Sequence, residues 1–268
     1  MRSVSENSEV VYVGLDVHKD SISAGVCWPG RESPEFERFF HDEVSIRRFV
    51  DRLGDRRQLR VCYEAGPTGL ELARLLEALR VPCEVIAPSL IPRAPGDRVK
   101  TDRRDARRLA RLLRAGELTP IHVPTRQEEA VRDLCRARTD MVIDLNRGRH
   151  RLSKFLLRHG QPYRGGTEWT DRHSRWLTGI RFDDPALGST FEHYRGVVTS
   201  RTAELRSIET DLAPWCDRDP FADAVHRLGA YRGITHLGAL HIAAEVADWR
   251  RFPRAGARPD LGSPSVTA

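Results

Sequence analysis

The first 114 residues alternate between strand-like and helix-like segments, and this alternation limits the fold more than any other feature of the chain. Runs rich in β-branched and aromatic residues predict five strands, at residues 10–15, 21–28, 35–40, 59–64 and 83–87. Apolar residues at helical spacing predict three helices, over residues 46–53, over residues 70–79 and from Thr101 onward. Three opening strands followed by alternating helices and strands predict an α/β fold, in which flanking helices cover a mixed sheet.

The pattern changes after Pro120 and Pro124, which mark a linker. Apolar residues at heptad spacing over 131–155 and again over 198–212 predict two long helices of an antiparallel or dimeric coiled coil. Residues 161–190 are rich in Gly, Trp and Arg and have no clear period, so we interpret them as a loop or a partly ordered insertion.

The last part of the chain begins near Asp219 and contains an apolar helix through residues 239–246. Residues 253–268 are too few and too poor in apolar side chains to form a domain. The sequence therefore predicts three parts: an α/β domain at 1–118, a helical coiled-coil region at 125–218, and a partial C-terminal helical domain at 219–268.

Composition narrows the possible partners and the cellular location. The 44 basic and 38 acidic residues give a net charge of +6, which suits a polyanionic partner without requiring one. No apolar run approaches the ~20 residues of a membrane-spanning helix, and Glu6 and Glu9 stand where a signal peptide would be apolar. We therefore expect a cytoplasmic protein with no membrane partner. The five cysteines form no C-x-x-C pair, which argues against a zinc knuckle or a disulfide framework.

Four acidic residues stand at the ends of apolar strands or on the apolar face of a helix, where a charged carboxylate is costly unless it is exposed, hydrogen-bonded or paired with a cation. Asp16 and Glu64 each close an apolar strand segment, although acids commonly follow strands. Asp102 and Asp105 share a helix face with Ala106, at the start of the helix, where the dipole and capping also favour aspartate. Capping and the helix dipole readily explain one aspartate at a helix start. They explain less well why two aspartates lie on the helix face that should pack against the sheet. A cluster of carboxylates is the usual protein contribution to a Mg²⁺ site for phosphodiester chemistry, so the four acids are candidate catalytic and metal-binding residues.

Basic residues are concentrated around the second pair of acids. Residues 93–114 contain nine Lys and Arg against three Asp, a density that could neutralise the phosphates of a nucleic acid. A solvated helix face in an arginine-rich protein is the competing interpretation for the outer arginines. The candidate nucleic-acid-binding residues are Lys19, Arg98, Lys100, Arg103 and Arg104.

Three blocks of sequence resemble the signature motifs of the DEDD transposases of the insertion sequence 110 family. They are YVGLDVHK at 12–19, YEAGPTG at 63–69 and KTDRRDA at 100–106, and the similarity extends to about residue 252. The resemblance implies a RuvC-like, ribonuclease H-like domain in which Asp16, Glu64, Asp102 and Asp105 bind Mg²⁺ for DNA strand cleavage and exchange. It also implies three kinds of partner: transposon and target DNA, a structured bridging RNA, and other copies of the chain in a dimer or tetramer formed through the coiled coil.

The sequence departs from the family pattern after Phe252. The family has a second domain that supplies a serine nucleophile, within a Gly-Leu-x-Pro and Ser-Gly segment that is not found here. Ser263 and Ser265 have no supporting helix, so we do not assign either as this nucleophile. We expect a truncated or frameshifted copy that binds metal and nucleic acid but does not complete recombination. The Gly233-Ile234-Thr235 segment resembles a helix-hairpin-helix, and a helix cap before a core helix is an equal alternative.

Three other functions fit parts of the pattern. A Holliday-junction nuclease of RuvC type has the same fold and four acids. A sugar kinase or actin-like ATPase also opens with Gly-x-Asp on a first strand, but it needs glycine-rich phosphate loops that the sequence lacks. The chain could instead be a non-catalytic DNA- or RNA-binding remnant, or a dimerisation partner of a full-length transposase.

Overall fold

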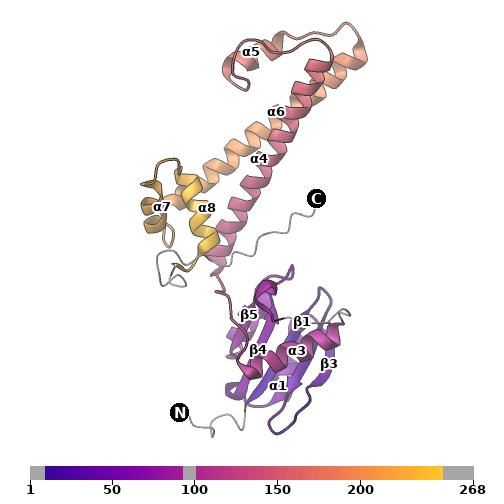
Figure 1. Ribbon diagram of the computed structural model, residues 1–268, viewed down its shortest axis with the longest axis vertical. Helices are drawn as coiled ribbons and strands as arrows, with labels where there is room; N and C mark the ends of the chain where they lie inside the picture. The colour runs from indigo at the N-terminus through magenta and orange to yellow at the C-terminus, as the bar shows by residue number, and fades with distance from the viewer. Residues whose placement is uncertain (1–9, 93–100, 250–268) are drawn as a thin grey trace. The chain divides into compact units, whose positions relative to one another are not determined.

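A computed structural model describes residues 10–92 and 101–249 of the chain (Figure 1). The chain divides into two compact units between Val123 and Pro124. Within the described residues, every helix is too short or too polar to cross a membrane.

The first unit is built on a mixed five-stranded sheet. Its strands and main helices, in chain order, are β1 Val11–Val17, β2 Ser21–Cys27, β3 Glu35–Phe40, α1 Glu43–Leu53, β4 Leu59–Glu64, α2 Glu71–Ala78, β5 Cys83–Ile86 and α3 Asp102–Ala115. The strands lie in the order β3-β2-β1-β4-β5. The two hairpin pairs are antiparallel, whereas β1 pairs with β4, and β4 with β5, in parallel. The predicted mixed sheet with flanking helices is confirmed.

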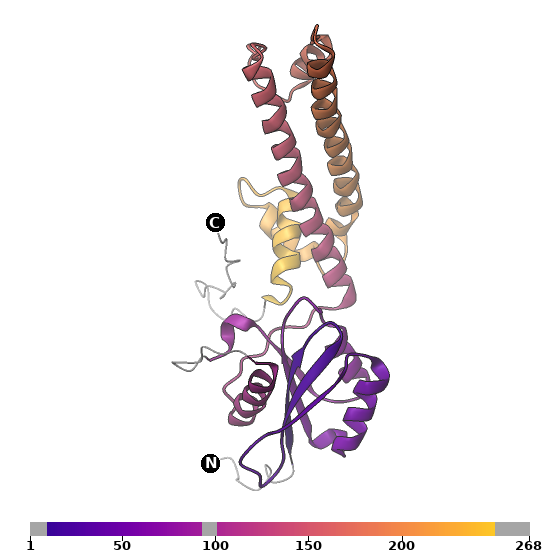
Figure 2. The same cartoon turned by 90° about the vertical axis from the view of Figure 1, so that its right-hand side faces the viewer.

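The two faces of the sheet carry different helices, as Figure 2 shows for α3 on one side. Alternate residues of a strand point to opposite faces. Val11, Val13 and Leu15 of β1 therefore join the core formed with α1 and α2. The opposite face packs against α3, which contributes Leu109 and Leu113 to a smaller cluster. Asp16 alternates with Leu15 along β1, so its side chain lies on the face of the sheet that packs against α3.

Helix α3 lies unusually close to the backbone of β1 and β2. A Cβ atom at Gly14 would be 2.3 Å from the backbone N of Ala110, and one at Gly25 would be 2.5 Å from the backbone O of Ala106. Both alanines are 0% exposed. We call Gly14 and Gly25 the α3 seat, because without side chains they let the backbone of α3 pack directly on the sheet. This close packing fixes where α3 begins relative to the end of β1.

The second unit is helical. Its helices are α4 Arg126–Arg158, α5 Asp171–Gly179, α6 Pro185–Leu212, α7 Ala222–Gly229 and α8 His236–Val246, and a short 3-10 helix at Ala213–Asp217 follows α6. The first unit also contains two short 3-10 helices, at Arg56–Gln58 and Pro88–Leu90. Helices α4 and α6 run antiparallel along one another (Figures 1 and 2). The two long helices are as predicted, whereas their coiled-coil packing and any association of copies through them stay predictions.

Residues 161–190, interpreted from the sequence as a loop or a partly ordered insertion, contain helix that the sequence pattern did not predict. Helix α5 lies inside this segment and α6 begins within it. Sequence periodicity missed α5 because the helix has only nine residues and buries just two of them, His173 and Leu177. Leu177 joins an apolar core, and the His173 and Trp176 rings stack with their centroids 5.4 Å apart.

Two apolar cores hold the helical unit together. One lies at the far end of α4 and includes Leu152, Phe155 and Phe191. The other joins the start of α4 to α7 and α8 through residues such as Val131, Val225 and Leu240. The predicted apolar helix after residue 235 is α8, and the assignment of 219–268 to a separate domain stays a prediction. Residues 250–268, including Ser263 and Ser265, lie outside the described residues.

Candidate metal centre

Asp16 and Glu64 lie at the carboxyl ends of neighbouring strands. Strands β1 and β4 are parallel, and Leu15 pairs with Tyr63, so the two acids occupy the next position on each strand. Both are half-buried and both line one open pocket, together with His18 and other residues of the loops that follow the strands. Adjacent carboxyl ends at one edge of a sheet are a common place for a binding site in α/β proteins.

The start of α3 brings a third acid to Asp16. Thr101 caps the helix, because its side chain accepts a hydrogen bond from the backbone N of Arg104, and Asp102 follows in the first turn. His18 bridges the two carboxylates: its Nε2 atom is 3.2 Å from Asp16 Oδ2 and 3.5 Å from Asp102 Oδ1. One ligand atom from each of Asp16, His18 and Asp102 lies within 4.8 Å of the other two, a spacing that could hold a metal ion.

The electrostatics of Asp16 reflect this crowding. Burial raises the pKa of the Asp16 carboxyl, and the negative charges of Asp102 and Asp105 raise it further. The charge and hydrogen bond of His18 act in the opposite direction but do not cancel the effect. Asp16 is therefore a carboxylate that is costly to ionise in the free protein, and a bound cation would relieve that cost.

The four predicted acids are not placed equally. Asp16 and Asp102 belong to the close group of possible ligands, and Asp105 acts on Asp16 through its charge. Glu64 shares the pocket with Asp16 but lies outside the close group. The structure thus links the other three acids to Asp16, and it brings one of them, Asp102, within ligand distance.

Sequence reasoning did not select His18 as a site residue. The signal was present, because an Asp-x-His spacing at the end of a strand places both side chains at the same edge of the sheet. A second histidine supports the loop, since His41 Nδ1 is 2.7 Å from the backbone O of His18. Both histidines line the same pocket as Asp16.

The donor set fits a divalent cation. Carboxylate oxygens are the ligands that Mg²⁺ and Mn²⁺ prefer, whereas imidazole nitrogen suits the later transition metals better. Asp16 and Asp102 offer carboxylate oxygens close to one another, and burial, together with the charges of Asp102 and Asp105, raises the pKa of Asp16 there.

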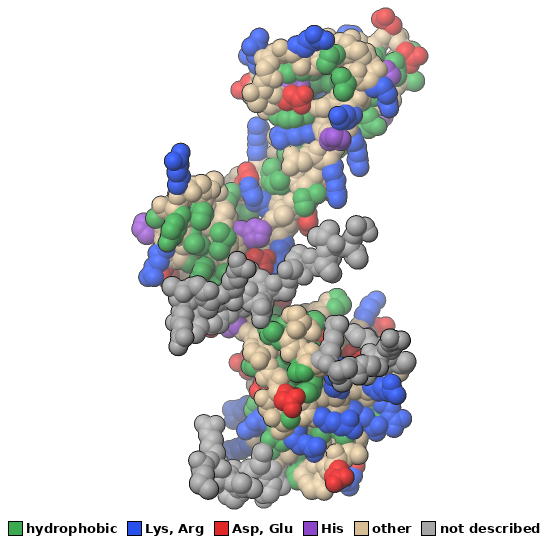
Figure 3. Space-filling model, viewed as in Figure 1, with side chains coloured by type: hydrophobic (Ala, Val, Ile, Leu, Met, Phe, Trp, Pro, Cys, Tyr) green, Lys and Arg blue, Asp and Glu red, His purple; other side chains and the backbone are tan. Residues whose placement is uncertain are grey.

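The candidate nucleic-acid-binding residues are only partly described. Lys19 is exposed and lines the pocket beside Asp16. Arg103 and Arg104 are exposed on α3, where Arg103 lies over the Phe36 ring at 5.4 Å. Figure 3 shows Lys and Arg side chains gathered over this helix. Arg98 and Lys100 lie outside the described residues.

Comparison with known proteins identifies the family. The family model DEDD_Tnp_IS110, described as "Transposase", matches residues 13–160. A putative transposase, y4qE of Sinorhizobium fredii, is 41% identical over 254 residues, which are 94% of this chain and 62% of that protein. The transposase for insertion sequence element IS1533 of Leptospira borgpetersenii is 36% identical over 244 residues, which are 90% of this chain and 70% of that protein. The chain therefore belongs to the DEDD transposases of the insertion sequence 110 family.

Proposed function

We propose that the first unit cleaves DNA strands with a Mg²⁺ ion held by Asp16, Glu64, Asp102 and Asp105. The observation that carries this proposal is the convergence of Asp16, His18 and Asp102 at the carboxyl ends of β1 and β4, where two further acids lie nearby. Membership of an insertion-sequence transposase family supplies the substrate class.

Each group in the site has a defined task in this proposal. When bound, the metal ion polarises a phosphoryl oxygen and lowers the pKa of water. The carboxylates of Asp16 and Asp102 hold the ion, and the His18 ring fixes their orientation through its contact with both. Lys19 at the pocket and the exposed Arg103 and Arg104 on α3 bind backbone phosphates.

Strand exchange, guidance by a structured RNA and assembly of several copies belong to the same proposal. They rest on the family resemblance, and part of each relative has no counterpart in the aligned residues, since the chain spans 62% and 70% of their lengths. We propose that the 268 residues supply metal and nucleic-acid binding to this activity. An assay of strand transfer by the purified chain on its own element ends tests whether they also carry out the exchange.

The test of cleavage uses the purified chain with duplex DNA from the element ends and with a four-way junction. We expect Mg²⁺-dependent cutting that falls at least ~10³-fold in Asp16→Asn and Asp102→Asn, because a metal-bound carboxylate has no substitute in the site. Asp183→Asn is the matched control, since it removes the same charge from an exposed residue of the second unit.

The outcomes separate the rival functions. Cutting of the four-way junction alone would favour a junction nuclease of RuvC type. Nucleic-acid binding that is equal in the wild type and in the Asp16→Asn and Asp102→Asn variants, with no cleavage by any of them, would favour a binding remnant or a dimerisation partner. Cleavage that survives Asp102→Asn would overturn the proposed site.

A further inference from the structure

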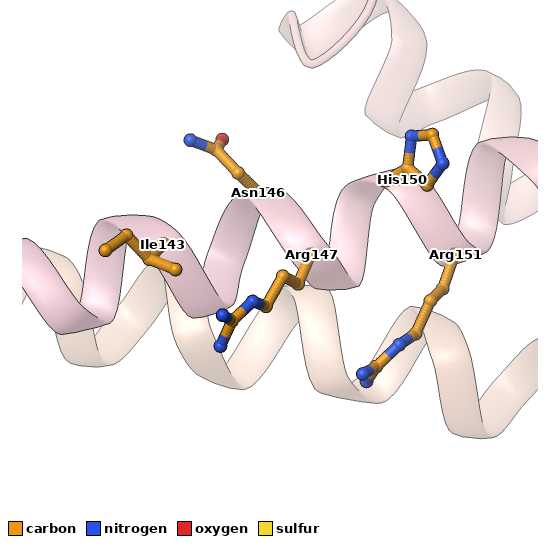
Figure 4. A pocket seen from close by; sticks show the side chains of 5 residues that line it. All are labelled: Ile143, Asn146, Arg147, His150 and Arg151. Carbon is orange, nitrogen blue, oxygen red and sulfur yellow. The ribbon is translucent and has the colours of Figure 1, made fainter. Parts of the chain in front are cut away.

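One exposed face of α4 forms a continuous strip along the second unit, far along the chain from the candidate metal centre. We define the α4 strip as six exposed residues spaced three or four apart: Ile143, Asn146, Arg147, His150, Arg151 and Lys154. Five of them line one shallow pocket, and Figure 4 shows Arg147 and Arg151 extending to the same side of the helix. The opposite face of α4 is buried at Leu145, Gly148 and Leu152, so the strip is free to meet a partner.

The charge of the α4 strip has little internal compensation. Asp144 neutralises Arg147 in part, with 3.4 Å between Arg147 Nη1 and Asp144 Oδ1. Among the residues that the structure describes, no acidic group pairs with Arg151 or Lys154. An exposed strip in which cations such as Arg151 and Lys154 stay uncompensated attracts a polyanion and repels a second copy of itself.

Other arginines of the same unit show the contrast. Arg195, Arg201 and Arg227 each form an ion pair with an acid three or four residues away on the same helix. Such pairs lie on solvated helix faces and leave little net charge for a partner. Arg151 and Lys154 of the α4 strip therefore differ from these paired arginines, whereas Arg147 resembles them through its contact with Asp144.

The side chains of the α4 strip match a phosphate backbone better than they match unstacked bases. The cations follow one another at roughly 4.5–6 Å along the helix, from the rise of ~1.5 Å per residue. Between Ile143 and Lys154 there is no Phe, Tyr or Trp, and the imidazole of His150 is the one exposed ring, so the strip offers only a small platform on which a base could stack. Asn146 and Arg147 can donate hydrogen bonds to phosphate oxygens.

We propose that the α4 strip binds the phosphate backbone of duplex DNA, without metal and independently of the four acids of the first unit. The proposal deepens the proposed function, because it names a second surface through which the chain holds its DNA. Because the α4 strip contacts phosphates, it increases the affinity for DNA of any sequence and does not distinguish one base from another.

The test measures the affinity of the full 268-residue chain for a fluorescent DNA duplex in EDTA, over a series of salt concentrations. The variant Arg147→Gln/Arg151→Gln/Lys154→Gln should bind at least ~10-fold more weakly near 100 mM salt, and the slope of log affinity against log salt should fall by about 2 to 3. The control variant Arg195→Gln/Arg201→Gln/Arg227→Gln removes the same charge from paired arginines and should change affinity less than ~3-fold. Circular dichroism melts establish that both variants are folded.

The outcomes are separable from those of the cleavage test, because EDTA removes any metal-dependent step. Binding by the strip variant equal to the wild type would overturn the proposal, as would an equal loss in the control variant. Weaker binding to an RNA hairpin with unchanged binding to the DNA duplex would identify RNA as the partner and overturn it. A changed oligomeric state in light scattering, with unchanged DNA binding, would mean that the strip joins copies of the chain.

Discussion

Two helix contacts in this protein are built on glycine, and they differ in how closely the elements approach. At the α3 seat, the missing Cβ atoms of Gly14 and Gly25 let helix backbone lie against strand backbone, within 2.6 Å of where those atoms would stand. Between α4 and α6, a Cβ atom at Gly148 would be 3.4 Å from the Cγ1 atom of Val197, an ordinary contact with a side chain.

The difference follows from what each contact must position. The α3 seat sets the distance between the first turn of α3 and the end of β1, where Asp102 and Asp16 meet. Backbone packed on backbone cannot adjust, so the geometry of the acids is fixed. Helix α4 carries the exposed α4 strip, and the interaction with a phosphate backbone that we propose for it would tolerate small shifts of the helix.

The largest expected effect is at the α3 seat. In Gly14→Ala, the new Cβ atom would clash with the backbone of Ala110, so α3 must move away from the sheet. We expect a loss on the order of 3 kcal/mol in the free energy of unfolding of the first unit. Hydrogen exchange measures this loss: peptides of β1 and α3 should lose protection, whereas peptides of α4 in the second unit should not.

Gly148→Ala is the matched substitution in the second unit. The added methyl group has room beside Val197, and alanine favours a helix interior over glycine by roughly 0.5–1 kcal/mol. We therefore expect unchanged or slightly increased protection of α4 against hydrogen exchange. Equal destabilisation by Gly14→Ala and Gly148→Ala would contradict the distinction between the two contacts.

An ion pair gives the second unit an acid that stabilises it when charged. Glu245 accepts two hydrogen bonds from Arg136, at 2.7 and 2.8 Å, which join α8 to α4. Burial acts to raise the pKa of Glu245, but the hydrogen bond and charge of Arg136 outweigh it and hold the pKa below its usual value. Since the folded pKa is lowered, this contribution is present above the unfolded pKa near 4.5 and is lost as the pH falls through the folded value.

Removing that pair should destabilise the second unit. We expect Glu245→Gln to cost about 1 kcal/mol at pH 7, a modest value because Arg136 remains exposed. The cost should diminish as the pH falls below about 4.5, where the wild-type carboxylate is itself being protonated. Urea unfolding at a series of pH values measures it, and a cost that did not vary with pH would argue against an ionic contribution.

Asp16 in the first unit should show the opposite sign. Its folded pKa is raised, so the ionised carboxylate opposes folding, and this penalty grows as the pH rises from the unfolded value near 3.8 through the folded value. We expect Asp16→Asn to stabilise the metal-free first unit at pH 7 by up to about 1 kcal/mol. Thermal unfolding in EDTA tests this, and a destabilised Asp16→Asn protein would show that the carboxylate has a structural role.

The order of elements in the first unit could be read from the sequence because strand and helix periods alternate clearly there. The positions of Asp16 and Glu64 followed from strand ends alone, since adjacent parallel strands bring their carboxyl ends together. That Asp102 meets Asp16 could be anticipated only from the helix face, because the distance depends on how closely α3 sits on the sheet.

Other features depend on packing that a sequence does not reveal. Nothing in a list of residues distinguishes Gly14 as a helix seat from a glycine that merely interrupts a strand. His18 joins the close group because the loop after β1 folds back toward α3. Helix α5 was hidden because it has only nine residues and buries only His173 and Leu177, too few to form a repeating apolar face.

The central claim is that Asp16 and Asp102 hold one divalent cation between the end of β1 and the start of α3. Isothermal titration of Mg²⁺ into the full chain, without nucleic acid, tests this claim directly. We predict one bound ion in the wild type and in Asp183→Asn, and an affinity at least ~10-fold weaker in Asp102→Asn. Equal Mg²⁺ affinity in Asp102→Asn and the wild type would contradict the claim.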